Sequence, residues 1–142
     1  MPKIRRRLTG VCGNETGSDM EYNRLYDGFI KLFPDDQEVF DTLSSKNSVY
    51  EEDGMHIVFG MIVVPYLQSI VLHEPSKAKK AFDYIEEMEK SGDPMIAEVV
   101  EFTILEALID AEDPNIHREC LKYMGEETKA ALNNIGKWFN KE

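Results

Sequence analysis

Three acid–proline pairs at nearly equal spacing constrain the fold of this chain more than any other sequence feature. They are Glu74-Pro75, Asp93-Pro94 and Asp113-Pro114, which follow one another at intervals of 19 and 20 residues. A carboxylate at the N-cap accepts hydrogen bonds from the free amides of the first turn, and proline suits the first helical position because no amide bond is lost there. Each pair therefore predicts a helix start. Gly92 is expected to end the first of these helices as a left-handed cap, and Gly125 the third.

The first of these helices has one apolar and one charged face. Its charged face is expected to pair in part as Lys79–Asp83 and Glu86–Lys90. The residues predicted to be buried are Ala78, Ala81, Phe82, Ile85 and Met88.

The second helix, predicted over residues 94–111, is apolar on two sides. One broad arc holds most of its aliphatic residues, and Phe102, Leu105 and Ile109 lie opposite that arc. A helix that is apolar on two sides is packed on two sides, so this helix is predicted to be central. Its acids, such as Glu98, are expected to fringe it.

The N-terminal part of the globular region also has a helical period. A single apolar stripe, which Pro34 ends, is formed by Tyr22, Leu25, Tyr26, Phe29, Ile30 and Phe33. Asp35 is then expected to be the N-cap, with Glu38 completing a capping pattern. The short helix that follows is expected to bury Val39, Phe40 and Leu43.

Residues 55–73 are ambiguous between strand and helix. Their β-branched residues suit a strand, but a predicted helix lies on each side, so we interpret the stretch as a buried helix kinked at Pro65. Its apolar part, 57–72, is 16 residues long and polar residues interrupt it, which favours a core helix over a membrane span. A last helix over about 126–140 is expected to bury Ala131, Leu132, Ile135, Trp138 and Phe139.

These patterns predict an all-α protein of six or seven helices in stacked antiparallel hairpins, either HEAT-like or an irregular bundle. Residues 20–142 are predicted to form a single helical domain. Residues 1–19 are interpreted as a basic, loop-like N-terminal arm or a non-native tail, because they hold four basic against two acidic side chains and no helical period.

The charge balance restricts the classes of partner. The chain of 142 residues has a net charge of −11, of which residues 20–142 carry −13. Such a surface repels nucleic acid and anionic membranes, so neither is expected as a partner. Cys12 and Cys120 are too few for a disulfide framework and are interpreted as free thiols in a reducing, cytoplasmic environment.

No motif predicts catalysis, a metal site or a cofactor. The three histidines have no metal-ligand spacing, and Glu98 and Glu101 lack the Glu-x-x-His partner of helical-bundle metal sites. An enzyme remains an alternative, and it would require His73, His117 and Glu106 to converge in one pocket.

The unit AFDYIEEMEKSGDPMIAEVVEFTILEAL, residues 81–108, joins an amphipathic helix to an apolar helix through a Gly-Asp turn. In this it resembles small acidic, all-helical bacterial proteins of HEAT-like shape that are found as immunity partners of toxin domains or, for the most part, are uncharacterised. The resemblance extends over about residues 21–140 and implies a binding function with no catalytic residues.

The sequence therefore favours a non-enzymatic protein-binding module, an immunity protein that neutralises a basic toxin domain such as a nuclease. The alternative is a helical adaptor that holds a peptide in its groove. Acids beside aromatic residues have the composition of interface hot spots. The residues expected to bind the partner are Tyr50, Glu51, Glu52 and Asp53 in a loop, and Asp83, Tyr84, Glu86 and Glu87 on a helix face.

Overall fold

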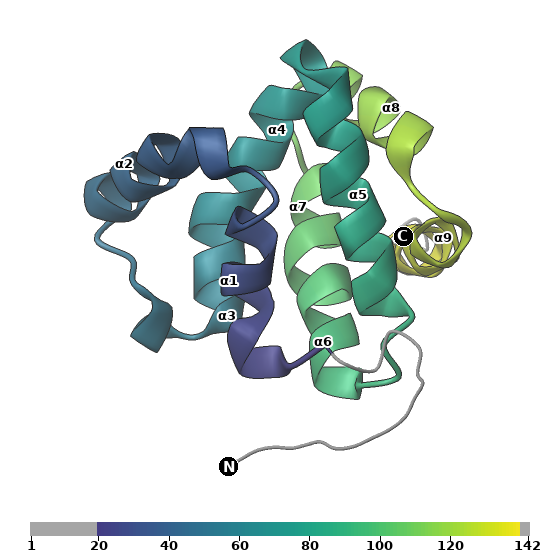
Figure 1. The fold of residues 1–142 in the computed structure, drawn as a ribbon. Helices are drawn as coiled ribbons and strands as arrows, with labels where there is room; N and C mark the ends of the chain where they lie inside the picture. Colours follow the sequence, from purple (N-terminus) through teal and green to yellow (C-terminus); the bar gives the residue numbers. More distant parts are fainter. Residues whose placement is uncertain (1–19, 140–142) are drawn as a thin grey trace.

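The computed structural model describes residues 20–139, with side chains as far as Ile135, and this part of the chain is all-α (Figure 1). It forms seven continuous helices, which confirms the predicted fold class. Two of the seven contain a π-helical segment, labelled η5 and η6. The bounds are α1 Leu25–Ile30, α2 Gln37–Asn47, α3 Met55–Val58 with η5 Phe59–Val63 and α4 Val64–His73, α5 Pro75–Glu89, α6 Pro94–Glu98 with η6 Val99–Leu105 and α7 Glu106–Ile109, α8 Pro114–Tyr123 and α9 Glu126–Phe139. Short 3-10 turns lie at η2 Tyr22–Arg24, η3 Pro34–Asp36 and η4 Glu51–Asp53.

All three acid–proline pairs start helices, although only two of the acids cap them. The carboxylates of Asp93 and Asp113 accept hydrogen bonds from the amides two residues on, at 3.0 and 2.9 Å. Glu74 makes no cap hydrogen bond, because its carboxylate pairs with Lys77 at 3.2 Å instead.

The two glycine predictions have different outcomes. Gly92 adopts the left-handed conformation, with φ of 82°, as expected. Gly125 does not: it precedes α9, and its carbonyl accepts the amide of Lys129 at the start of that helix. The prediction that Gly125 ends α8 in the left-handed conformation is therefore wrong.

Residues 55–73 form one helix, which settles the strand-or-helix ambiguity. Its π segment η5 lies directly before Pro65, whose ring nitrogen cannot donate to the carbonyl four residues back. That carbonyl, on Met61, accepts the side-chain amide of Asn47 at 3.1 Å instead. By length and composition this is the one helix in the described residues that could cross a membrane, but 56% of its most apolar window is buried inside the domain.

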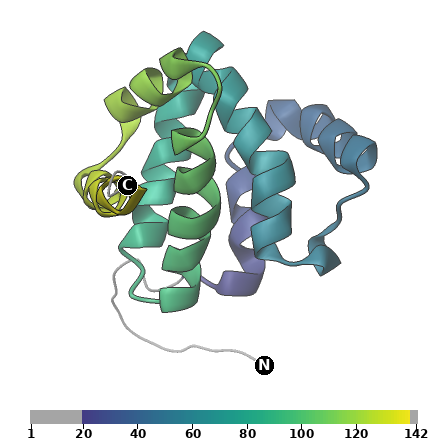
Figure 2. The ribbon, with the colours of Figure 1, turned by 180° about the vertical axis from the view of Figure 1, so that it is seen from behind.

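The helix of residues 94–109 is central, as predicted, and runs beside the helix of residues 55–73 (Figure 2). Their π segments η5 and η6 pack against each other. Beside this contact, Nδ1 of His56 in α3 and Oγ1 of Thr103 in η6 lie 2.6 Å apart. A Cβ added to Gly60 would lie 3.4 Å from the methyl carbon of Thr103, and no other atom outside its own helix would lie within 4 Å of it. Leu105 is buried as expected, whereas Phe102 is 56% exposed, so one predicted packing residue faces outward.

An aromatic cluster joins α1 and α2 to the rest of the core. The ring of Phe29 contacts those of Phe33, Phe40, Phe59, Tyr66 and Tyr84. Asp36 adds a polar tie, because its carboxylate accepts the hydroxyl of Tyr66 at 2.5 Å and the ammonium of Lys77 at 2.7 Å. These hydrogen bonds, Lys77 first, hold the pKa of Asp36 below its ordinary value.

Several predictions for individual residues need correction. The helix that follows Pro34 starts after Asp36, with no side-chain cap, so the pattern of Asp35 and Glu38 does not open it. Phe40 is buried, but Val39 is exposed. The five residues predicted to be buried on α5 are all fully buried. Ala131 and Leu132 of α9 are also buried, although a small part of each is exposed. The predicted burial of Trp138 and Phe139, and the prediction for residues 1–19, fall outside the described side chains.

Candidate binding groove

Asp27 lies on the outer face of α1 at the meeting point of three hollows, which we call together the Asp27 groove. The hollows have volumes of about 310, 440 and 560 Å³, and Asp27 lines each of them. One opens towards α5, one towards α2 and one towards the η4 loop.

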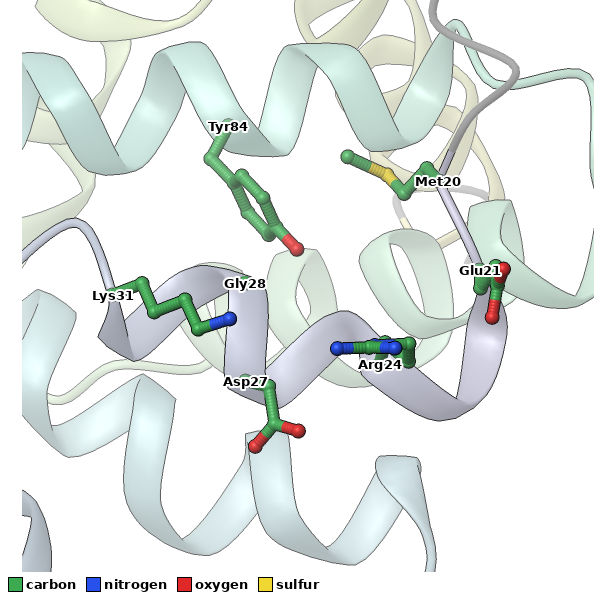
Figure 3. Close-up of a pocket in the computed structure, with 7 residues that line it drawn as sticks. All are labelled: Met20, Glu21, Arg24, Asp27, Gly28, Lys31 and Tyr84. Carbon is green, nitrogen blue, oxygen red and sulfur yellow. The ribbon is translucent and has the colours of Figure 1, made fainter. Parts of the chain in front are cut away.

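The 440 Å³ hollow lies between α1 and α5 and has mixed charge. It is lined by Met20, Glu21, Arg24, Asp27, Gly28, Lys31 and Tyr84 (Figure 3). Tyr84 reaches from α5 towards Gly28, and its hydroxyl donates to the carbonyl of Leu25 at 2.9 Å. Burial raises the pKa of Tyr84 to about 12, so this hydroxyl stays protonated and serves as a fixed donor.

The other two hollows are strongly acidic. Carboxylates from three elements line them: Asp27 on α1, Asp41 on α2, and Glu51 and Glu52 on η4. Among the described residues, no lysine or arginine forms a salt bridge with any of these four. Elsewhere on the surface, acids such as Asp83 and Glu119 do have such partners. These two hollows of the groove therefore concentrate negative charge that no described salt bridge offsets.

The carboxyls of Asp27 and Glu51 contact each other. Burial, and then the hydrogen-bonded and charged carboxyl of Asp27, raise the pKa of Glu51 above its ordinary value, and Glu52 adds to the effect. Like charges held together disfavour ionisation, and a cation placed between them would relieve the repulsion. The groove is thus suited to receive a lysine or arginine side chain.

The predicted loop residues lie together at the edge of this groove. Glu51, Glu52 and Asp53 are exposed in η4, and Tyr50, which precedes them, is 50% exposed. The loop is shaped by its own hydrogen bonds, because the carboxylate of Asp53 accepts the amide of Tyr50 at 2.9 Å. Gly54, with φ of 99°, then turns the chain into α3.

The predicted residues on α5 are more dispersed. Asp83 and Glu87 are exposed, and Asp83 forms the predicted pair with Lys79 at 3.0 Å. Tyr84 is half-buried and lines the α5 side of the groove.

Glu86 is half-buried at the start of α9. Its carboxylate accepts the amides of Glu127 and Thr128 at 3.0 and 2.9 Å and the hydroxyl of Thr128 at 2.7 Å. The predicted salt bridge between Glu86 and Lys90 is wrong, because the carboxylate is directed to α9 instead.

Sequence reasoning missed Asp27 and Asp41, which complete the acidic part of the groove. Asp27 follows two buried residues of α1, and nothing local distinguishes it from a solvated surface acid. The helical period alone could have placed Asp27 on the side of α1 opposite the apolar stripe. That Glu51 would lie against it depends on how the η4 loop packs on α1, which no local pattern encodes.

The family comparison matches residues 26–140 to a family described as a domain of unknown function, DUF7674. The chain belongs to this family. The matched region includes the four carboxylates of the two acidic hollows, whereas Met20, Glu21 and Arg24 of the third hollow lie before it. Comparisons of this DUF7674 domain with the curated proteins and with the solved structures find no match in either.

The residues of the enzyme alternative lie elsewhere in the DUF7674 domain. His73 is the last residue of α4, Glu106 is the first of α7, and His117 lies on α8, and none of the three lines the Asp27 groove. In the described part of the chain, no three His, Cys, Asp or Glu side chains are grouped so that they could hold a metal ion. Cys120 is buried, and burial raises its pKa to about 12, so its thiol is not activated as a nucleophile.

Proposed function

We propose that this protein is a non-enzymatic binding module that recognises a basic protein partner through the Asp27 groove. The observation that carries the proposal is the set of four carboxylates, from α1, α2 and η4, that line adjoining hollows without a described cation partner. A basic side chain of a partner would supply the missing counter-charge.

The surroundings of the groove fit protein recognition better than recognition of a free ion. Tyr50 and Tyr22 line the acidic hollows, and Tyr50 is half exposed. Aromatic side chains beside charged groups are enriched at interface hot spots, because they bury a large area at low entropic cost. The hollows adjoin one another at Asp27, so that several side chains projecting from one partner surface could enter them together.

The kind of partner we propose is a basic toxin domain such as a nuclease, which the protein would neutralise as an immunity protein. A nuclease presents a positively charged surface to phosphate, and an acidic protein can occupy that surface. The similarity to immunity-type proteins stated above supports this choice. The DUF7674 description itself carries no function.

The test is a pair of matched charge reversals. Glu51→Lys with Glu52→Lys changes the groove, and Asp110→Lys with Glu112→Lys makes the same change in net charge on exposed residues between α7 and α8. Asp53 is left unchanged because its carboxylate shapes the loop. Binding partners captured from the native cell with the wild-type chain are identified, and association rates are then measured with the purified partner.

We expect the groove variant to associate at least ~10-fold more slowly at low salt and the control variant to change by less than ~3-fold, because steering depends on charge near the contact. The wild-type rate should fall as salt rises. Equal slowing by both variants would remove the groove from consideration. A partner bound only at ~μM affinity, with no activity inhibited, would favour the adaptor alternative over an inhibitor.

A further inference from the structure

The helices α5 and α9 and the π segment η6 pack together on the side of the domain away from the Asp27 groove (Figure 1). Carboxyl groups supply the polar contacts of this junction. Glu86 on α5 accepts three hydrogen bonds from the first turn of α9. The close approach leaves no room at Gly125, where a Cβ would lie 2.4 Å from the carboxyl carbon of Glu86.

A second carboxyl on α5, that of Glu89, points into the same junction. Its Oε2 atom is shielded from solvent and accepts no hydrogen bond from a described donor. Its neighbour within hydrogen-bonding reach is the carboxyl of Glu101, which projects from η6. Two ionised carboxylates cannot bond to each other, because neither has a hydrogen to donate. The pair can form its hydrogen bond only while the two groups share a proton.

The other charges around the pair strengthen this requirement. Glu86 on α5 and Glu127 on α9 add negative potential at Glu89, and Lys90, next to Glu89 in sequence, acts on Glu86. Burial, and then the contact with Glu101, raise the pKa of Glu89 to about 8.

We propose that Glu89 and Glu101 form a proton-dependent latch, which holds η6 and α9 against α5 while the pair shares a proton and loosens this junction when the proton is lost. The latch differs from the groove in place and in chemistry, and it would give the protein a response to pH that is independent of partner binding. Either idea can fail without the other.

The direction of the response follows from proton linkage. In the open junction, Glu89 would have the ordinary glutamate pKa near 4.5, whereas in the closed junction its pKa is higher. The closed form therefore binds one more proton, and the closing contribution is complete below about pH 4.5 and is lost as the pH rises towards about 8. Glu86 acts in the opposite sense. Although burial alone would raise its pKa, the hydrogen bonds from Thr128 and Glu127 hold that pKa below its ordinary value, so its cap on α9 weakens only in acid.

Hydrogen exchange at several pH values tests the latch. Backbone amides of η6 and of the first two turns of α9 are followed between pH 5.5 and 8.5 in the full chain, and rates are corrected for the intrinsic effect of pH on exchange. In the wild type, the local opening constant should rise with pH, by at most ~10-fold per pH unit for one linked proton. Amides of α2, which is remote from the pair, serve as the internal reference.

Glu101→Gln is the diagnostic variant, because its amide can donate to Glu89 without titrating. It should keep the junction closed and abolish most of the pH dependence. Glu89→Gln places the amide donor on α5 instead and should have the same effect. It serves as the test if Glu101→Gln folds poorly. Glu87→Gln, an exposed carboxyl on the same helix, is the matched control and should keep the wild-type slope. A flat wild-type profile, or the same slope in Glu101→Gln as in the wild type, would overturn the proposal.

Discussion

Gly28 has no Cβ, and this absence lets α1 pack closely on α5 beside the hydroxyl of Tyr84. A Cβ on Gly28 would lie 2.4 Å from the hydroxyl oxygen of Tyr84, and the nearest ring carbon would lie at 3.2 Å. We expect Gly28→Ala to lower the free energy of unfolding by about 1–3 kcal/mol, because overpacking there outweighs the higher helix propensity of alanine. Urea unfolding would measure this change.

The same substitution in a Tyr84→Phe background provides the control. Without the hydroxyl oxygen, only ring carbons remain near the added methyl group, so Gly28→Ala should then be nearly neutral. Tyr84→Phe alone loses one hydrogen bond to a backbone carbonyl and should cost about 1 kcal/mol. Additive effects of the two substitutions would show that the hydroxyl is not what excludes a side chain at residue 28.

Residues were predicted well where their role is local and poorly where it depends on a distant partner. The caps Asp93 and Asp113 act within two residues of themselves, and the sequence was sufficient to identify them. Glu86 was expected to pair along its own helix with Lys90. Its actual partners are 41 and 42 residues away. The local pairing was a reasonable expectation, but three hydrogen bonds to the start of α9 compete better for the same carboxylate.

At the scale of elements, the helices of residues 55–73 and 94–109 pack together through their π segments. Gly60 of η5 lies beside Thr103 of η6, and a Cβ added to Gly60 would be in ordinary contact with the methyl carbon of Thr103 at 3.4 Å. Gly60→Ala should leave the free energy of unfolding unchanged or raise it by up to about 1 kcal/mol, because alanine favours helix. Gly60→Leu should lower it by about 1–3 kcal/mol by forcing η5 and η6 apart.

Thermal unfolding monitored by circular dichroism would compare the two variants. Equal stability of Gly60→Ala and Gly60→Leu would indicate that the segments can separate without cost. The existence of the helices could be predicted from apolar periodicity and capping, but the π segments could not. A π turn differs from an α turn by one residue per turn, and packing between helices selects it without a characteristic residue pattern.

At the scale of the whole molecule, net charge opposes compaction. The 27 acidic residues exceed the 16 basic ones, and the four salt bridges found among the described residues offset only part of the repulsion. Stability should therefore rise as salt increases from ~20 to ~200 mM, because screening weakens repulsion between separated charges. Urea unfolding at each salt concentration tests this.

The groove variant Glu51→Lys with Glu52→Lys belongs to the same comparison. It removes like charges around Asp27, so its stability should equal or slightly exceed that of the wild type and depend less on salt. A large loss of stability would contradict the exposure of the η4 loop. The all-α architecture was predictable at this scale, whereas the acidic part of the groove was not, since α1, α2 and η4 line it together and no local pattern encodes their relative placement.

The π segment η6 also affects how relatives of this chain should be compared. Each residue turns an α-helix by about 100°, so the one extra residue in a π turn re-aims every side chain beyond it by that amount. If the same sequence formed a regular α-helix without the π turn, Glu101 and the residues of α7 could not both keep their present directions. A DUF7674 sequence one residue shorter between 99 and 105 could therefore form a regular α-helix there and still present the same surface after that point, whereas a sequence of equal length without the π turn would present a different one.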